Sequence, residues 1–206
     1  METEIRKIVS YILKEYVMQE TRDVKTEILE ATIRLFYEKG LKFTMDDLAA
    51  VLRCSKKTIY VYVADKTALL DEMVDFLFDR IQKRKQEVLL NTSRPVIESI
   101  RELLGAMSDE YQDIDFRQLY ILKEKYPGIY AHVEKRLESD WEPVIALLDK
   151  GMEEGAVRRF PVIVLQTMMQ ATLEQFFQRD ILLQNGITYH EALQEVVNIL
   201  VDGIRK

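Results

Sequence analysis

Two neighbouring stretches of sequence decide the fold: residues 24–40 read VKTEILEATIRLFYEKG, and residues 43–70 read FTMDDLAAVLRCSKKTIYVYVADKTALL. In the first stretch, apolar residues recur on one helical stripe, which comprises Val24, Ile28, Ala31, Leu35 and Phe36. Gly40 follows the last of them, where the left-handed backbone that ends many helices costs glycine least. The stretch therefore predicts an amphipathic helix that ends at Gly40.

The second stretch has the signals of two short helices joined by a tight turn. Thr44 is a good N-cap residue, whose hydroxyl can accept a hydrogen bond from the amide of Asp47. Arg53 and Cys54 form the turn, and Ser55 is a good N-cap for the next helix. The spacing of cap, turn and cap predicts a helix-turn-helix.

The predicted helix after Ser55 has a polar outer face. Ile59 and Val63 must face inward, because they are its apolar residues. The residues then directed largely outward are Lys56, Lys57, Thr58, Tyr60 and Tyr62. The N-terminal residues of a recognition helix reach base edges in the major groove, where such side chains contact bases or phosphates. A three-helix bundle with a solvated basic face would also explain two adjacent lysines, but the cap and turn spacing favours a DNA reader.

The whole segment resembles the DNA-binding domain of the TetR family of bacterial one-component regulators. The likeness is carried by ILEATIRLFYEKG, by FTMDDLA and, most specifically, by SKKTIYVYVADKTALL. The family places threonine, tyrosine, an aromatic residue or histidine, and lysine where this chain has Thr58, Tyr60, Tyr62 and Lys66. The resemblance implies that Lys56, Lys57 and Thr58 face bases. It also implies that phosphates are held by Thr44, Tyr60, Tyr62 and Lys66.

One position departs from the family pattern, because the family usually has glycine in the turn where this chain has Arg53. Another residue fits there with a negative φ, or at modest strain with a positive φ. The charge of Arg53 suggests an additional phosphate contact. Unchanged operator affinity and salt dependence in Arg53→Ala would contradict that hypothesis.

The net charge of −6 is unevenly distributed. Residues 21–70 carry nine Lys/Arg against seven Asp/Glu, whereas residues 71–206 carry seventeen against twenty-four. The length accommodates a domain of about 50 residues and one larger domain, which we place at 21–70 and 71–206. The asymmetry is compatible with DNA binding by residues 21–70, because the acidity lies in residues 71–206. The single cysteine excludes an internal disulfide.

The first twenty residues form a third part. Their apolar stripe predicts an extra amphipathic helix before the usual start of TetR-like chains, and it comprises Ile5, Ile8, Val9, Ile12, Leu13, Tyr16 and Val17. Met18 would itself make a plausible start, so the sequence leaves open whether residues 1–17 belong to the natural product. Charges throughout residues 1–20 argue against a signal peptide, and no window approaches a membrane span, so we expect a cytoplasmic protein.

The C-terminal part predicts helices only. A long helix should run from Lys66 to about Leu90. Further helices are predicted near 95–112, 115–125, 129–151 with a kink near Ser139 caused by Pro143, 161–182 and 188–204. The predicted fold class is therefore all-α, with an N-terminal helix-turn-helix domain and a C-terminal helical domain for effector binding and dimerisation.

The resemblance implies that the last two long helices pair with those of a second subunit in a homodimer. The residues expected at this interface are Leu165, Met169, Thr172, Phe176, Val196 and Leu200. The other helices should enclose an effector pocket, whose candidate lining residues are Met107, Tyr111, Phe116, Tyr120, Trp141, Ile145 and Met168. Their methionine and aromatic character suggests an apolar or aromatic small molecule.

Enzymatic and metal-binding motifs are absent from the sequence. It has no G-x-G-x-x-G, G-x-x-x-x-G-K-[ST], G-x-S-x-G or H-E-x-x-H, and neither His132 nor His190 follows a glutamate by three residues. We therefore expect no catalysis, no metal and no cofactor. The sequence predicts a ligand-responsive homodimeric repressor of a palindromic DNA operator. The alternative is a DNA-bound scaffold of the same fold that recruits a protein partner without a small-molecule effector.

Overall fold

The computed structural model describes residues 24–107, 116–139 and 141–206. Within these ranges the chain is helical, as predicted, and its only extended pairing is a single bridge between Val157 and Arg205. The described residues separate into two compact units, which we name the head (residues 24–73) and the body (residues 74–206). The helix predicted over residues 1–20 lies outside the described residues.

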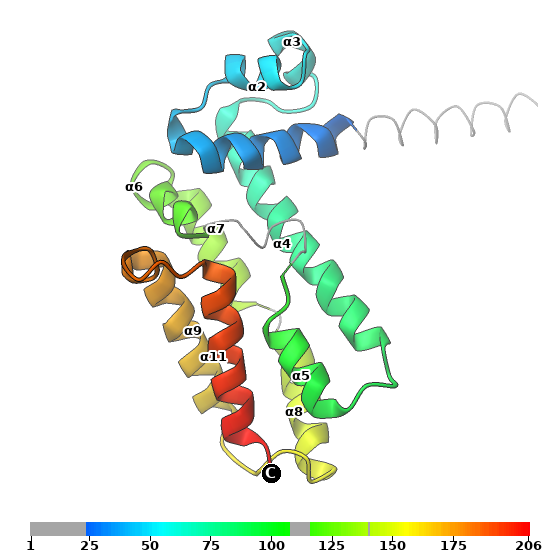
Figure 1. Ribbon diagram of the computed structural model, residues 1–206. Helices are drawn as coiled ribbons and strands as arrows, with labels where there is room; N and C mark the ends of the chain where they lie inside the picture. The colour runs from blue at the N-terminus through cyan, green and yellow to red at the C-terminus, as the bar shows by residue number, and fades with distance from the viewer. Residues whose placement is uncertain (1–23, 108–115, 140) are drawn as a thin grey trace, which may run out of the picture. The chain divides into compact units, whose positions relative to one another are not determined.

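The head consists of short helices around one apolar core. Its elements are a helix over residues 24–39, η1 (Gly40–Lys42), α2 (Met45–Val51), α3 (Lys56–Ile59) and the start of α4 (Lys66–Leu90) (Figure 1). Every one of these helices except η1 contributes buried apolar side chains, among them Ile28, Phe36, Leu48, Ile59 and Leu69. Gly40 has a φ of 58°, which confirms the left-handed end predicted for the first helix.

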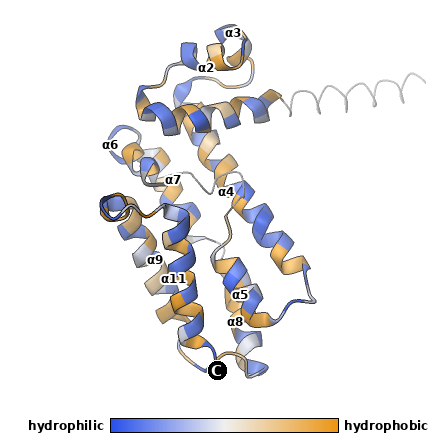
Figure 2. Cartoon of the chain, in the orientation of Figure 1, coloured by the Kyte–Doolittle hydropathy of each residue, from blue (hydrophilic) through white to orange (hydrophobic). Residues whose placement is uncertain are grey.

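The body is built from helices that bury one face and expose the other. Its elements are the rest of α4, α5 (Val96–Leu104), η3 (Phe116–Ile121), α6 (Leu122–Lys125), α7 (Pro127–Glu138), α8 (Glu142–Glu153), α9 (Val162–Gln178), α10 (Ile181–Gln184) and α11 (Tyr189–Ile204). Figure 2 shows apolar and polar residues alternating along these helices, as amphipathic helices require. In the body α5 packs against α8, and α11 packs against both α5 and α9.

The segment predicted as one helix over residues 129–151 is two helices. Ser139 has an extended backbone, with φ −79° and ψ 168°, and ends α7. Pro143 lies in the first turn of α8. A proline ring clashes with the carbonyl four residues earlier, which is that of Ser139, but proline fits at a helix start. The predicted position of the disturbance is therefore correct, and its size was underestimated.

Other helix ends also differ from the predicted ones. α5 ends at Leu104, with Gly105 as its C-cap, instead of running on towards residue 112. α9 ends at Gln178, because Arg179 is extended, and the separate short helix α10 follows. The predicted α4 and α11 match the structure closely.

Candidate nucleic-acid interface and ligand cavity

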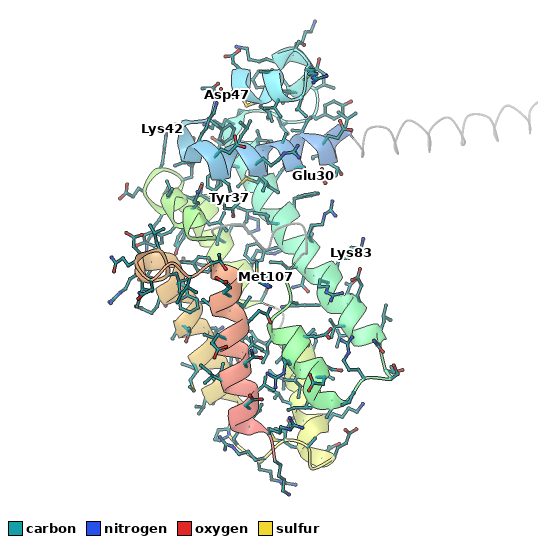
Figure 3. All side chains as sticks on the ribbon, in the orientation of Figure 1. Glu30, Tyr37, Lys42, Asp47, Lys83 and Met107 are labelled. Atoms are coloured by element: carbon teal, nitrogen blue, oxygen red, sulfur yellow. The ribbon has the colours of Figure 1, made fainter. Side chains whose placement is uncertain are left out.

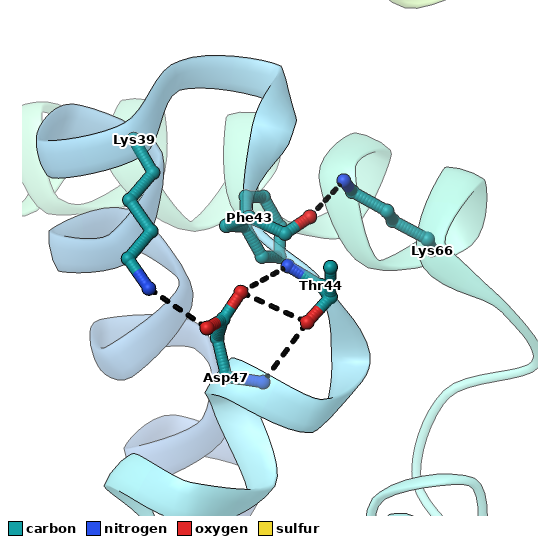
Figure 4. A network of polar contacts seen from close by, with 5 residues as sticks. All are labelled: Lys39, Phe43, Thr44, Asp47 and Lys66. Carbon is teal, nitrogen blue, oxygen red and sulfur yellow. Dashed lines mark hydrogen bonds and ion pairs between the residues drawn. The ribbon is translucent and has the colours of Figure 1, made fainter.

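The start of α2 is fixed by a network that includes the side chains of Lys39, Thr44 and Asp47 (Figure 4). The Thr44 hydroxyl accepts a hydrogen bond from the Asp47 amide at 3.1 Å and donates to Asp47 Oδ2 at 2.8 Å. The Asp47 carboxylate also accepts from the Thr44 amide at 2.7 Å and from Lys39 Nζ at 2.7 Å. This is a complete capping box, as the Thr44 spacing predicts.

The same contacts make Asp47 an unusually strong acid. The hydrogen bond from Lys39, followed by those from the Thr44 amide and hydroxyl, lowers the pKa of Asp47 from 3.8 to about 2. Hydrogen bonds that favour the charged form act in this direction. Asp47 is therefore fully ionised at neutral pH, where it also complements the positive N-terminal end of α2.

The turn between α2 and α3 holds a non-glycine residue in the left-handed region. Arg53 has a φ of 53°, the positive φ that the sequence alone did not decide. The Arg53 amide donates to Ala50 O at 3.2 Å, and the Cys54 amide donates to Ala49 O at 3.0 Å. These two bonds form the Schellman pattern, whose left-handed position usually carries glycine.

Ser55 starts α3 and sets its orientation. Its hydroxyl accepts a hydrogen bond from the Thr58 amide at 3.1 Å, and Ile59 and Val63 are buried as predicted. The side chains of Lys56, Lys57 and Thr58 are consequently exposed on the outer face. The cap and the buried anchors therefore present three predicted DNA-contacting residues from one short helix.

The exposed residues of α3 differ in how they are held. Lys56 Nζ forms an ion pair with Asp46 at 3.0 Å, and Thr58 Oγ1 lies 2.9 Å from Ser55 Oγ. Among the described residues, no carboxylate lies within ion-pair distance of Lys57. Lys57 can therefore bind an anionic group without first breaking an ion pair with a described carboxylate.

The aromatic segment after α3 is partly exposed, and it contains Val61, an exposed residue that was not among the predicted contacts. Tyr60 is 46% exposed, Tyr62 is intermediate, and Val61 between them is 74% exposed. An aliphatic side chain on such a surface can contact a thymine methyl group. The sequence signal for Val61 is its position between Tyr60 and Tyr62, two predicted contact residues.

Lys66 has a structural role in addition to the one implied by the resemblance. Its Nζ donates to Leu41 O at 2.8 Å and to Phe43 O, and it lies 4.1 Å from the centre of the Phe43 ring (Figure 4). These contacts attach the first residue of α4 to the segment before α2. Lys66 therefore helps to fix the α2–α3 pair within the head.

The body contains a cavity of about 100 Å³ and an adjoining hollow of about 320 Å³. The two share Leu137, Trp141, Leu173 and Phe177. Of the predicted pocket residues, the buried Met107 lines the first and Trp141 lines both. Burial, together with the negative charge of Glu134, raises the pKa of Tyr130 in the hollow to about 12, so its hydroxyl is neutral.

Several predicted pocket residues have other positions. Tyr120, Ile145 and Met168 do not line either of these two spaces: Tyr120 packs edge-on against Tyr130, and Met168 is about half exposed. The predicted Tyr111 lies outside the described residues, and Phe116 begins η3. The cavity lining that the sequence reasoning missed includes Phe78, Leu103, Arg136, Met169, Tyr189 and Leu193. They come from five helices, so no spacing in the sequence connects them.

The predicted dimer residues divide into two groups. Leu165 and Met169 are each only 3% exposed in the single subunit, so they belong to its own core, which corrects their assignment to the interface. Thr172, Phe176, Val196 and Leu200 are of intermediate exposure. Exposed apolar residues on the same two helices are Ile163, Val164, Met168 and Ile199. The prediction therefore assigned two residues of the buried face of α9, Leu165 and Met169, to the face expected to meet a second subunit.

The described residues include neither a metal-binding cluster nor a helix able to cross a membrane. No group of three or more His, Cys, Asp or Glu within them is placed to hold a metal ion. None of the described helices combines the length and the apolar character that crossing a bilayer demands.

Comparisons with known proteins agree with this architecture. Residues 28–73 match the family model of bacterial regulatory proteins of the tetR family. The uncharacterized HTH-type transcriptional regulator YvaF of Bacillus subtilis is 27% identical over 177 residues, which cover 86% of this chain and 93% of that protein. The HTH-type transcriptional repressor KstR2 of Mycobacterium tuberculosis is 23% identical over 140 residues, covering 64% of this chain and 68% of that protein.

Solved structures show the same fold. The ketosteroid transcriptional regulator KstR2 superimposes with a TM-score of 0.58 at 20% identity, covering 88% of this chain and 95% of that one. A TetR transcription regulator from Haloarcula marismortui gives a TM-score of 0.68 at 17% identity, covering 90% of this chain and 100% of that one.

Proposed function

Because this chain belongs to the TetR family of bacterial regulatory proteins, we propose that it is a homodimeric repressor that releases a palindromic operator when a small molecule binds the body. Regulation of transcription through a helix-turn-helix is the function of its relatives. We assign DNA recognition to residues 21–70, and effector binding and dimerisation to residues 71–206. The protein would act in the cytoplasm, and catalysis forms no part of the proposal.

The observation that carries the DNA-binding part is the exposed N-terminal end of α3. Lys56, Lys57 and Thr58 stand there on a helix anchored by the buried Ile59 and capped by Ser55. We propose that these three residues face base edges and that Thr44, Tyr60, Tyr62 and Lys66 hold phosphates. Thr44 has one hydroxyl proton, which it donates to Asp47, so it would turn that proton to the phosphate.

Dimerisation supports the same function. Two recognition helices read a palindrome when they are separated by one turn of DNA, about 34–36 Å. The exposed apolar residues of α9 and α11 would pair with the same helices of a second subunit. Among the predicted interface residues, those that we retain are Thr172, Phe176, Val196 and Leu200.

The effector would act through a difference in affinity for two conformations of the body. A hundredfold preference corresponds to about 2.7 kcal/mol, within the usual range for coupling between two sites. We propose α4 as the element that responds, because this continuous helix begins in the head and continues into the body. An effector that favours the wrong separation of the recognition helices lowers operator affinity.

The test is binding to the DNA upstream of the gene, measured by fluorescence anisotropy at several salt concentrations. We expect wild type to bind one site tightly in the presence of competitor DNA. Lys57→Ala combined with Tyr60→Ala should lose that preference, and loss of a phosphate contact should lower the salt slope by about one. Lys83→Ala is the control, because it removes the same charge from an exposed position on α4 of the body, where the side chain extends outward (Figure 3). Equal, weak and salt-sensitive binding by all three proteins to every fragment tested would contradict the proposal.

A further inference from the structure

The cavity of the body has two basic side chains in its lining, those of Lys85 and Arg136. Its described polar and charged lining consists of Gln82, Lys85, Arg136, Ser139 and Tyr189, and no carboxylate is among the described lining residues. The remainder of the lining is apolar. The adjoining hollow differs, because Glu134 and Glu174 are part of its lining. The described basic side chains therefore line the first space and the described acidic side chains line the second, with Trp141 and Phe177 shared between them.

Arg136 is held in the cavity wall by two aspartates of α4. Its Nη1 donates to Asp75 Oδ1 at 3.0 Å and its Nη2 donates to Asp79 Oδ1 at 2.7 Å. The guanidinium also lies 5.4 Å from the centre of the Phe78 ring, another residue of the lining. A guanidinium has five N–H donors in a planar fork, and these two bonds use two of them. The group is therefore fixed in orientation and retains donors for a third oxygen ligand.

We propose that this cavity binds an apolar carboxylate, with the carboxylate at Arg136 and the apolar body running past Trp141 towards the adjoining hollow. A carboxylate matches the planar fork of the guanidinium, whereas the described lining of the hollow has Glu134 and Glu174 and no lysine or arginine to receive it. Burial raises the pKa of the Tyr189 phenol, so a neutral hydroxyl lines the same cavity. The apolar walls supply the area for the rest of the molecule.

This inference rests on the proposed function, and it identifies the contact through which a bound ligand would act on α4. Asp75 and Asp79 lie one turn apart on α4, and their shared partner Arg136 lies on α7. A bound carboxylate adds a third negative charge beside this one guanidinium. It therefore weakens the attachment of α4 to α7 by competition for the same cation. The ligand thus has a differential interaction with two positions of α4, which coupling requires.

Isothermal titration calorimetry of the full-length protein with three probes of one chain length tests the proposal. We expect octanoate to bind at least ten times more tightly than 1-octanol, and octylammonium to bind most weakly. Arg136→Gln should reduce octanoate affinity to that of 1-octanol and leave 1-octanol within twofold. Asp79→Asn should tighten octanoate severalfold, because it removes a competitor for Arg136.

Arg101→Gln is the matched control. The Arg101 side chain is as exposed as that of Arg136, at 22% each, and it also forms an ion pair with an aspartate, Asp202 at 2.6 Å. It does not line the described cavity. If Arg101→Gln lowers octanoate affinity as much as Arg136→Gln, or if Arg136→Gln weakens both probes equally, Arg136 acts only through stability and the proposal is wrong. The proposal is also overturned if none of the probes binds wild type, or if 1-octanol or octylammonium binds best.

Operator binding measured in the same samples separates this inference from the proposed function. Octanoate that binds through Arg136 without changing operator affinity supports the ligand class and contradicts ligand-induced release. Specific operator binding without octanoate binding would show that the proposed ligand class is wrong, and it would leave the proposed repressor function unaffected. In that case the scaffold that recruits a protein partner becomes the stronger reading.

Discussion

The turn after α2 in the head and the turn after α10 in the body have the same hydrogen bonds and different residues. In the head, Arg53 donates to Ala50 O and Cys54 donates to Ala49 O. In the body, Gly186 donates to Leu183 O at 3.1 Å, and the next amide donates five residues back at 3.0 Å. Gly186 has a φ of 67° and Arg53 a φ of 53°. The body thus has the residue that this backbone favours, and the head does not.

This difference indicates that the two turns are under different constraints. A left-handed backbone costs a residue with a Cβ about 1–2 kcal/mol, and such strain persists where packing on both sides fixes the backbone. On either side of Arg53 in the chain, Leu48 of α2 and Ile59 of α3 are fully buried and anchor their helices. The head therefore tolerates a residue that does not favour stability, at a position beside the proposed DNA contacts.

The largest effect on stability is expected from a substitution in the turn after α10 of the body. Gly186→Ala should destabilise the protein by about 1 kcal/mol, because alanine disfavours the positive φ. A Cβ at Gly186 meets no atom within 4 Å, so crowding would not contribute. Urea denaturation at fixed protein concentration measures the change. Gly128→Ala is the control, since its Cβ also meets open space and its φ is not positive, and we expect no loss of stability.

The comparison also shows why the head could be predicted from sequence in more detail than the body. Caps and stops act over three to six residues, so Gly40, Thr44 and Ser55 specify their helix ends locally. Pro143 likewise predicts the disturbance at Ser139. The sign of the backbone angle at Arg53 could not be predicted, because arginine does not require a positive φ.

The cavity is the opposite case. Its wall combines Phe78 of α4, Arg136 of α7 and Leu193 of α11, and their proximity depends on how the helices pack. Periodicity identifies an apolar face, but it does not distinguish a face buried in the subunit from one that meets a partner. For that reason Met169, predicted at the dimer interface, proved to line the cavity. Met107 and Trp141, chosen for their type and position in the chain, do line this cavity, and their contact with an effector stays a prediction.

A smaller effect on stability, of opposite sign, is expected when glycine replaces Arg53 in the turn after α2 of the head. Arg53→Gly should stabilise the protein by about 0.5–1 kcal/mol, because relief of the left-handed strain exceeds the entropy that glycine loses on folding. Urea denaturation measures the gain. Arg53→Ala is the matched control, since it removes the same charge and keeps the strain, and it should give no gain.

The same pair of variants tests the hypothesis of a phosphate contact at Arg53. If the guanidinium contacts a phosphate, both variants should lower the salt slope of operator binding by about one. An unchanged slope in both would show that the charge does not act on DNA. Destabilisation by Arg53→Gly would contradict the interpretation that the turn is strained.

The smallest effect concerns the capping boxes, of which the described residues of each unit have one. Thr44 and Asp47 cap α2, and Thr188 and Glu191 cap α11 in the same way. Hydrogen bonds lower the pKa of Asp47 to about 2, and those from Thr188 lower the pKa of Glu191. A carboxylate whose pKa is lower in the folded state stabilises the fold above its unfolded pKa and loses that effect as the pH falls towards the folded value.

For Asp47 this window extends from about pH 3.8 down to about pH 2. We expect Asp47→Asn to unfold at a lower urea concentration than wild type at pH 6, and the difference to shrink as the pH falls from about 3.8 to about 2, where about half of the folded-state Asp47 carboxyls are protonated. Hydrogen exchange of the α2 amides would assign the change to the head. Glu191→Gln should produce the corresponding change at α11 and leave the α2 amides unaffected. A difference between Asp47→Asn and wild type that stays constant from pH 6 to pH 2 would mean that the cap acts through its shape, because the carboxylate charge would then contribute nothing.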